Sequence, residues 1–93
     1  MVVEIQAKFE KELRKTPQYI QDQALVVLDK LLIAESLNTA GVDYKRLKGQ
    51  EKNRNYYRIR IGEYRIGIEH LHPTLIIMRI IHRGKAYDEF PPK

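Results

Sequence analysis

The stretch from Tyr56 to Arg83 constrains the fold more than any other part of this chain. It reads YYRIRIGEYRIGIEHLHPTLIIMRIIHR, and apolar and polar side chains alternate through most of its length. Alternation with a period of two is typical of strands that bury one face and expose the other. Gly62-Glu63 and a later segment that contains Pro73 interrupt the pattern as turns would. The stretch therefore predicts three antiparallel strands joined in a meander.

The alternation divides the side chains of this meander between two faces. The apolar face carries Tyr57, Ile59, Ile61, Tyr64, Ile66, Ile68, Ile76, Met78 and Ile80. The opposite face carries Ile77, Ile81, the acidic residue Glu69 and five arginines, namely Arg58, Arg60, Arg65, Arg79 and Arg83. These arginines could simply keep the face hydrated and discourage edge pairing. Because clustered arginines repel one another and a guanidinium binds phosphate bidentately, we favour a phosphate-binding surface.

The beginning of the chain predicts a strand and a short helix. Segment 2–6 is β-branched and alternating, which favours a strand that joins the sheet. Phe9 and Leu13 lie four residues apart among charged side chains, and this spacing places both on one face of a short amphipathic helix.

A second helix is the clearest element outside the meander. Thr16 is a good N-cap residue and Pro17 is tolerated at the first helical position, so the helix is expected to run from about Pro17 to about Ala34. Its buried stripe consists of Ile20, Ala24, Val27, Leu28, Leu31 and Leu32. The predicted fold is α+β, with two N-terminal helices packed on one face of a mainly antiparallel four-stranded sheet in the order β-α-α-β-β-β.

The segment from Leu37 to Asn55 is predicted to be a loop that Leu47 anchors to the core, because it is polar and contains two glycines. The second half of this loop is basic and carries Lys45, Arg46, Lys48, Lys52 and Arg54. For any one of these residues a solvated surface position is the simpler explanation. Together they extend the arginine face of the next strand, which favours a continuous basic surface.

Composition indicates one small domain with a polyanionic partner. The chain has 93 residues, room for a single core, so residues 1–93 are predicted to form one domain. Lys and Arg outnumber Asp and Glu by 17 to 12, and the net charge of +5 favours nucleic acid, an anionic membrane surface or an acidic protein as partner. The mixed charges of the helices argue against the membrane surface. There is no cysteine, no signal-peptide pattern and no apolar run long enough to span a membrane, so we expect a cytoplasmic protein.

His82 is the candidate general base. It stands beside Arg83, whose positive charge favours the neutral imidazole that a base needs. Strand alternation counts against it, because a regular strand directs His82 away from Arg83 unless a bulge intervenes. His70 and His72 are expected to be exposed in a turn, and no His, Asp and Glu cluster has ligand spacing, so neither a metal nor a cofactor is expected. Tyr87 either anchors the C-terminal tail or contacts RNA.

Three motifs occur in order along the chain: LKG at 47–49, GEYRIGIE at 62–69 and IIHRGKAY at 80–87. They follow a strand, two helices and a basic loop. This combination resembles the RelE/ParE superfamily of bacterial toxin–antitoxin toxins, and the likeness covers nearly the whole chain.

The resemblance implies a small domain with helices on one side of a mainly antiparallel sheet, and a cognate antitoxin that wraps around the toxin and inhibits it. RelE-like members cleave mRNA in the ribosomal A site without metal, by attack of a 2′-hydroxyl on the adjacent phosphate. The corresponding catalytic candidates here are Arg58, Arg60, Arg65, His82, Arg83 and Tyr87. The further candidates for binding RNA or phosphate are Lys45, Arg46, Lys48, Lys52, Arg54, Arg79 and Lys85.

Two alternatives to a ribosome-dependent ribonuclease stay open. One is a ParE-like toxin that binds DNA gyrase and cleaves no RNA. The other is a non-catalytic relative that uses the same surface only to bind nucleic acid. For the ribonuclease toxin itself, contact with DNA is expected only indirectly, through the antitoxin complex. ParE-like members typically lack the basic catalytic set, so the arginines of the meander favour the ribonuclease. Arginine is a poor base, which leaves the base as either His82, an arginine or a group of the ribosome.

Overall fold

The computed structural model describes residues 1–48, 50 and 54–92 and confirms the α+β class. Its elements in chain order are β1 (Val2–Ile5), α1 (Ala7–Arg14), α2 (Gln18–Ile33), the 3-10 turn η1 (Leu37–Thr39), β2 (Tyr44–Arg46), β3 (Tyr56–Ile61), β4 (Tyr64–Leu71), β5 (Thr74–His82) and α3 (Arg83–Glu89). Among the described residues, no helix is long and apolar enough to cross a membrane.

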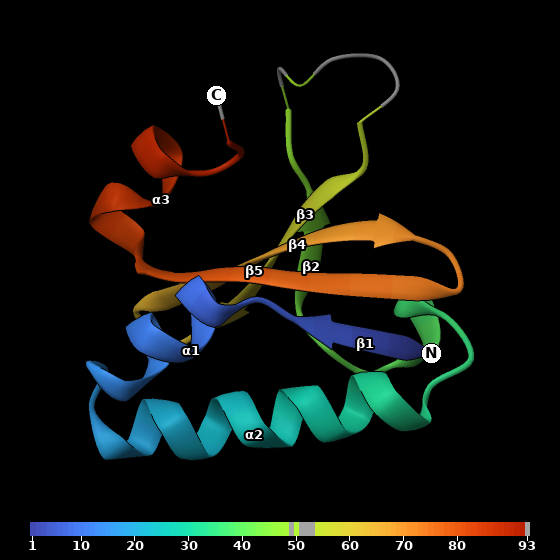
Figure 1. Ribbon diagram of the computed structural model, residues 1–93, viewed down its shortest axis with the longest axis horizontal. Helices are drawn as coiled ribbons and strands as arrows, with labels where there is room; N and C mark the ends of the chain where they lie inside the picture. Colours follow the sequence, from blue (N-terminus) through green and yellow to red (C-terminus); the bar gives the residue numbers. More distant parts are fainter. Residues whose placement is uncertain (49, 51–53, 93) are drawn as a thin grey trace.

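The sheet has five strands in the order β1-β5-β4-β3-β2, where four were predicted. β1 runs parallel to β5, and the other neighbours are antiparallel (Figure 1). The additional strand, β2, lies within the segment that was predicted to be a loop, and it pairs Tyr44 with Ile59 and Arg46 with Tyr57. Three residues, two of them charged, are too few to show alternation, so only the pairing with β3 identifies this strand.

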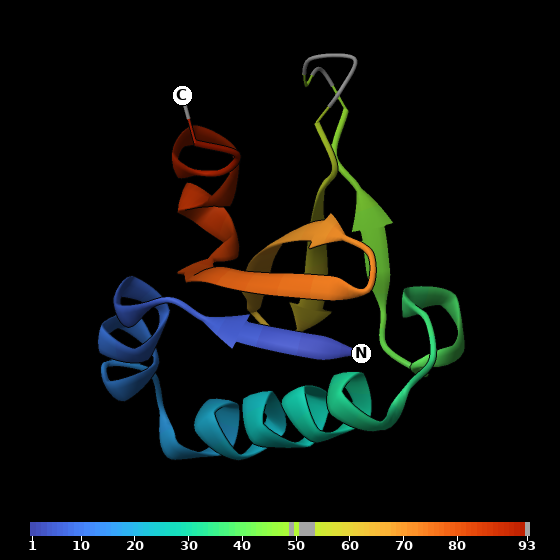
Figure 2. The ribbon, with the colours of Figure 1, turned by 45° about the vertical axis from the view of Figure 1, so that its right-hand side comes forward.

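The helices lie on both sides of the sheet. Figures 1 and 2 show α1 and α2 on one side and α3 on the other. The core lies between α2 and the sheet, and its fully buried large side chains are Phe9, Ile20, Leu31, Ile59, Ile66, Ile68, Leu75 and Ile77. Leu13, which was predicted to belong to this core, is half-buried at its margin. The predicted packing of the two N-terminal helices on the apolar face of the sheet is therefore confirmed.

A register shift in β5 changes the faces that alternation assigned. Gly67 pairs with Arg79 and Ile68 with Ile77, so Met78 is an extra residue opposite β4. Ile77 consequently points into the core, although it was assigned to the arginine face. Met78 was expected in the core and instead packs in a second cluster on the opposite face. A bulge reverses the parity of every residue on one side of it, which no reading of strict alternation detects.

The start of α2 differs from the prediction at Thr16. Its hydroxyl donates to the carbonyl oxygen of Leu13 at 2.7 Å, so it closes the end of α1 and does not cap α2. Pro17 occupies the N-cap position of α2 without a side-chain hydrogen bond. Leu32 was predicted on the buried stripe, but it is 52% exposed and lies outside the face of α2 that packs on the sheet.

The C-terminal residues, taken from the sequence as a tail, form α3 and then return to the sheet through Phe90. The Phe90 ring is 6% exposed and packs with Tyr56 and Ile81 on the face opposite α2. The residues that follow α3, Phe90 and Pro91, thereby form one side of the cavity above the arginine face, and we call this side the wall.

Leu28 and Leu32 form a matched pair for testing the packing of α2. Leu28 is 7% exposed in the core, so Leu28→Ala is expected to lower the free energy of unfolding by about 2–5 kcal/mol. Leu32→Ala removes the same atoms from an exposed position and is expected to change it by about 0.5 kcal/mol or less. If chemical denaturation showed the same loss of unfolding free energy for both substitutions, the packing of α2 on the sheet would be contradicted.

Candidate functional site

The arginine face is built from cross-strand pairs of like charge. Arg60 on β3 lies directly opposite Arg65 on β4, and Arg58 on β3 lies directly opposite Lys45 on β2. Residues that face each other across antiparallel strands project on the same side of the sheet, so the four cations share one surface. Like charges directly opposite each other destabilise a sheet. An anion bound between them would relieve this repulsion.

Two adjoining cavities form a concave surface over these pairs, and we call them together the basic groove. One has a volume of about 330 Å³ and is lined by Lys45, Arg46, Leu47, Lys48, Arg58, Phe90 and Pro91. The other, of about 230 Å³, is lined by Asp43, Lys45, Arg58, Arg60 and Arg65. Lys45 and Arg58 belong to both cavities, so they lie at the centre of the groove.

The apolar wall of the groove depends on a glycine. A Cβ atom at Gly67 of β4 would lie 2.8 Å from three ring atoms of Phe90, closer than real Cβ contacts allow. Any other residue at this position would push the ring off the sheet. Phe90 also meets Tyr56 edge to face, with ring centroids 5.5 Å apart. Sequence reasoning missed this wall and also Asp43, because their part in the groove follows from packing and strand register.

Backbone carbonyls orient two of the arginine side chains. Arg65 donates through Nη1 to the carbonyl oxygens of Gly62 and Tyr64, at 3.0 and 2.9 Å. Arg46 donates through Nη2 to the carbonyl oxygen of Arg54 at 2.7 Å, which ties the two arms of the β2–β3 hairpin together. Such bonds fix the direction of a guanidinium group.

Arg83 is the first residue of α3 and is not among the residues that line the groove. Its backbone N–H donates to the carbonyl oxygen of Glu63 at 2.8 Å, which brings it next to the β3–β4 turn that precedes Arg65. Its exposed side chain forms an ion pair with the Glu63 carboxylate at 2.8 Å. A surface ion pair of this kind contributes little to stability, so an arriving phosphate could replace the carboxylate.

His82 and Lys85 lie outside the basic groove. Together with Lys15 and Tyr64 they line a separate depression. His82 accepts the Gly84 N–H at Nδ1, 3.2 Å away, and caps α3. Its ring stands edge to face against Tyr64, at 5.4 Å between centroids. The bulge that would turn His82 toward the arginines falls at Met78 instead, so the structure does not bring His82 to the groove.

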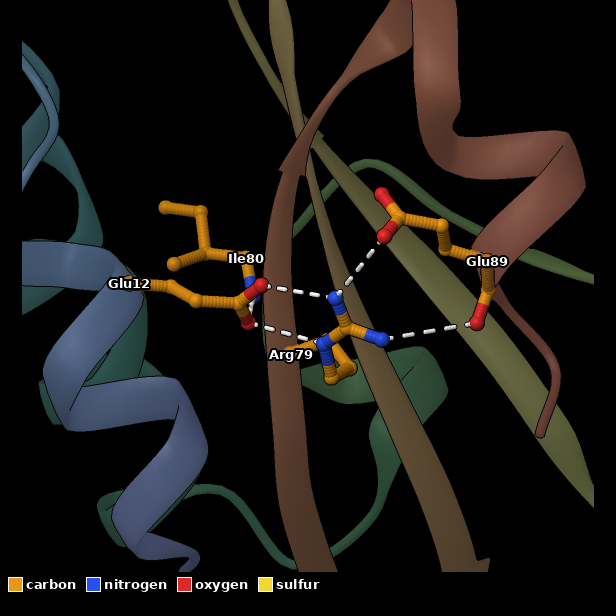
Figure 3. A network of polar contacts seen from close by, with 4 residues as sticks. All are labelled: Glu12, Arg79, Ile80 and Glu89. Atoms are coloured by element: carbon orange, nitrogen blue, oxygen red, sulfur yellow. Dashed lines mark hydrogen bonds and ion pairs between the residues drawn. The ribbon is translucent and has the colours of Figure 1, made fainter.

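Arg79 is the arginine that the structure removes from the predicted phosphate-binding set. Its side chain is 13% exposed and binds Glu12 of α1 bidentately, at 2.9 Å from Nε and 2.7 Å from Nη2 (Figure 3). It also lies 3.6 Å from the carboxylate of Glu89 on α3. The hydrogen bond with Glu12 raises the pKa of Arg79 above its ordinary value. Alternation placed Glu69 on the arginine face, and the structure adds carboxylates from other elements, because Glu12 and Glu89 engage Arg79 and Glu63 engages Arg83.

Three predicted site residues remain to be placed. Lys52 lies outside the described residues, as does Gly49 of the LKG motif. Tyr87 belongs to α3, but its side chain is outside the described part of the structure. Arg54 stands at the far end of the hairpin, with its guanidinium 6.0 Å from the centre of the Tyr56 ring.

His70 is half-buried in β4, whereas it was expected to be exposed in a turn with His72. Its Nε2 atom is buried and has no hydrogen-bond partner among the described residues. Burial, and then the nearby charge of His72, lower the pKa of His70 below its usual value. His72 is exposed, as expected. Within residues 1–48, 50 and 54–92, no group of three His, Cys, Asp or Glu side chains could hold a metal ion.

Comparison with known proteins identifies the family. Residues 3–87 match the family model described as the ParE toxin of the type II toxin–antitoxin system parDE. The chain is 41% identical over 83 residues to Toxin RelE3 of Methanocaldococcus jannaschii, with 89% of this chain and 91% of that protein covered. The chain belongs to the RelE/ParE family of type II toxins. The family resemblance drawn from the three motifs is therefore confirmed.

Solved structures show how closely this RelE/ParE toxin follows the family fold. The RelB-RelE antitoxin-toxin complex from Methanococcus jannaschii has a chain that matches with a TM-score of 0.78 at 38% identity, covering 95% of this toxin and 99% of that chain. The archaeal RelE-RelB complex from Pyrococcus horikoshii gives a TM-score of 0.68 at 24% identity, covering 91% and 97%. At that identity the second match shows the fold alone.

The half-buried His70 predicts a stability that depends on pH. Because its pKa is lowered on folding, the unfolded chain binds more protons below about pH 6.5, and stability is lost as pH falls from there through the folded pKa. His70→Gln is expected to reduce the fall in melting temperature between pH 7.5 and pH 5. His72→Gln, which leaves the burial of His70 unchanged, should keep most of the fall. Identical pH profiles for wild type and His70→Gln would sink this assignment.

Proposed function

We propose that this RelE/ParE toxin is an endoribonuclease that cleaves mRNA on the ribosome and thereby inhibits translation. The observation that carries the proposal is the pair of like-charge contacts, Lys45 with Arg58 and Arg60 with Arg65, on the floor of one groove. A sheet selected for stability alone would place opposite charges there. The negative charge of a phosphate backbone complements these cations.

The chemistry of the groove suits attack by a 2′-hydroxyl on the adjacent phosphate. In this step the 2′-oxygen forms a bond to phosphorus, the bond to the 5′-oxygen breaks, and negative charge grows on the phosphoryl oxygens between the two events. Arg58, Arg60 and Arg65 line the groove and stabilise that charge, and backbone carbonyls orient Arg65 before the substrate arrives. The proton of the 2′-hydroxyl passes to a base, and the departing 5′-oxygen takes up a proton. The step as proposed uses no metal or cofactor.

The outer part of the groove fits contacts with RNA on both sides of the scissile phosphate. Lys45, Arg46 and Lys48 are exposed along it, and Arg54 extends the same charge to the end of the hairpin. Contacts of this kind bind phosphates regardless of base sequence and weaken as salt increases. They provide a surface for mRNA and ribosomal RNA.

A RelB-type antitoxin is the proposed protein partner. The M. jannaschii chain that shares 38% identity with this toxin was crystallised as an antitoxin–toxin complex with RelB. A net charge of +5 and a groove lined by six cationic residues suit an acidic segment that folds as it binds.

A ParE-like activity on DNA gyrase is the second candidate, because the matching family model is that of the ParE toxin. Such an activity leaves mRNA intact. The arginines of the groove favour the ribonuclease, and direct assays distinguish the two.

Substitutions in the groove test the ribonuclease. Arg58→Ala and Arg65→Ala are each expected to reduce ribosome-dependent mRNA cleavage on the order of 10²–10³-fold, since each removes a cation from beside the reacting phosphate. Arg83→Ala should act in the same direction. Arg14→Ala, which removes an arginine whose side chain is 71% exposed on α1, should leave cleavage unchanged. Primer extension on mRNA from a translation mixture measures the cleavage.

His82→Gln is the companion variant in the same assay. Since His82 caps α3 outside the groove, cleavage by this variant is expected to stay within a few fold of wild type. A loss as large as that of Arg65→Ala, together with loss of the acidic limb of the pH profile, would make His82 the base. Should wild type cut no mRNA but inhibit gyrase supercoiling, the ribonuclease proposal fails and the ParE-like activity replaces it.

The antitoxin proposal predicts that co-expression with a RelB-type antitoxin from an adjacent reading frame restores growth and yields a stable complex. The complex should form less readily with a variant that carries Arg58→Ala and Arg65→Ala, because the acidic segment loses its counter-charges. Size-exclusion chromatography of the co-expressed pair measures both. Unimpaired growth of cells that produce the wild-type toxin alone would count against a toxin that needs an inhibitor.

A further inference from the structure

The Glu12 side chain accepts a backbone hydrogen bond from β5 that a neighbouring strand would otherwise accept. β1 pairs with β5 only as far as Ile77, and the Gln6 N–H then donates to the Ile77 carbonyl oxygen at 3.0 Å. Beyond this point α1 lies beside β5, and Glu12 Oε1 accepts the backbone N–H of Ile80 at 3.2 Å. A side-chain carboxylate thus satisfies a backbone donor just past the bulge.

The same carboxylate begins a network that reaches α3 through Arg79. Glu12 binds both Nε and Nη2 of Arg79, and Arg79 in turn contacts Glu89 at its carboxylate, 3.6 Å away, and at its carbonyl oxygen, 3.5 Å away. Figure 3 shows Arg79 between the two glutamates, with α1 on one side and α3 on the other. Arg79 is 13% exposed and Glu12 is 23% exposed. In such a setting an arginine that loses a partner keeps a poorly solvated charge.

The network ends next to the wall of the basic groove. Glu89 is followed directly by Phe90, whose ring rests on Gly67. Phe90 and Pro91 line the 330 Å³ cavity together with Lys45 and Arg58. A shift of Glu89 would therefore move Phe90 and Pro91 relative to Lys45 and Arg58 on the opposite side of the cavity.

We propose that Arg79 is a positioning residue for the groove: held by Glu12, it fixes Glu89 and so sets the distance of the Phe90–Pro91 wall from the arginines. This inference rests on the proposed function of the groove as an RNA site. Arg79 itself does not touch the substrate. A misplacement of about 1 Å in a reacting site can reduce the rate by as much as 10²-fold, so a small movement of the wall is sufficient to matter.

Glu89→Gln tests the proposal, with Glu10→Gln as its matched control. Both substitutions remove one negative charge from the toxin, and within the described residues the Glu10 side chain forms an exposed ion pair with Arg14 on α1. A general gain in attraction for RNA therefore appears in both variants, whereas movement of the wall appears only in Glu89→Gln. Arg79→Lys is a second variant, because it keeps the charge of Arg79 but loses the two-pronged bond to Glu12.

The position of the wall can be measured directly by NMR. The Phe90 ring stacked on Gly67 shifts the Gly67 Hα resonances through its ring current. We expect Glu89→Gln and Arg79→Lys to move these resonances toward ordinary glycine values and to reduce mRNA cleavage by about tenfold. Glu10→Gln should resemble wild type in both measurements. Thermal melts of the three variants show separately how much each loses in stability.

Other combinations overturn the proposal. Unchanged Gly67 resonances with reduced cleavage would mean that Glu89 or Arg79 acts on RNA directly. Moved resonances with full cleavage would mean that the wall does not set activity. If wild type cuts no mRNA, the proposed function fails, and the affinity for a fluorescein-labelled single-stranded RNA replaces cleavage as the readout. In that case binding about tenfold weaker for Glu89→Gln than for Glu10→Gln supports the positioning role, and equal binding ends it.

Discussion

Burial of one face of the sheet under α2 is the constraint on which the rest of this toxin depends. Ile59 on β3 and Ile66 on β4 are fully buried in that core. Since successive side chains of a strand point to opposite faces, burying these residues directs Arg58, Arg60 and Arg65 to the other face. The free energy of folding thus holds these three cations on one surface, although they contribute little to that free energy themselves. A change of register by one residue would destroy the core and the groove together.

The arginines of the meander have two different physical roles. Arg58 and Arg60, in the groove, lie opposite other cations, namely Lys45 and Arg65, across the sheet. Arg79 on β5 forms ion pairs with Glu12 of α1 and Glu89 of α3, so its charge links these three elements. The difference does not come from residue type or strand parity. It comes from which neighbouring elements bring glutamates to each position.

Much of the fold followed from the sequence, because its two periodicities are clear. The alternation from Tyr56 to Arg83 predicted three strands, and the helical stripe from Ile20 to Leu31 predicted α2 and its buried face. The same alternation predicted that Arg58, Arg60 and Arg65 share a surface. It failed in β5, where the extra residue Met78 reversed the parity, and in β2, which is too short to carry a pattern.

What the sequence by itself determined is therefore the apolar face, the arginine face opposite it and, through three motifs, the toxin family. Only the tertiary structure decided which basic residues meet. It gathered Lys45 with Arg58, placed His82 at the start of α3, and set Phe90 against Gly67 as a wall. Periodicity reports the direction in which a side chain leaves its own strand. The partners it finds there depend on strand order, register and helix placement, which are set by packing between segments far apart in the chain.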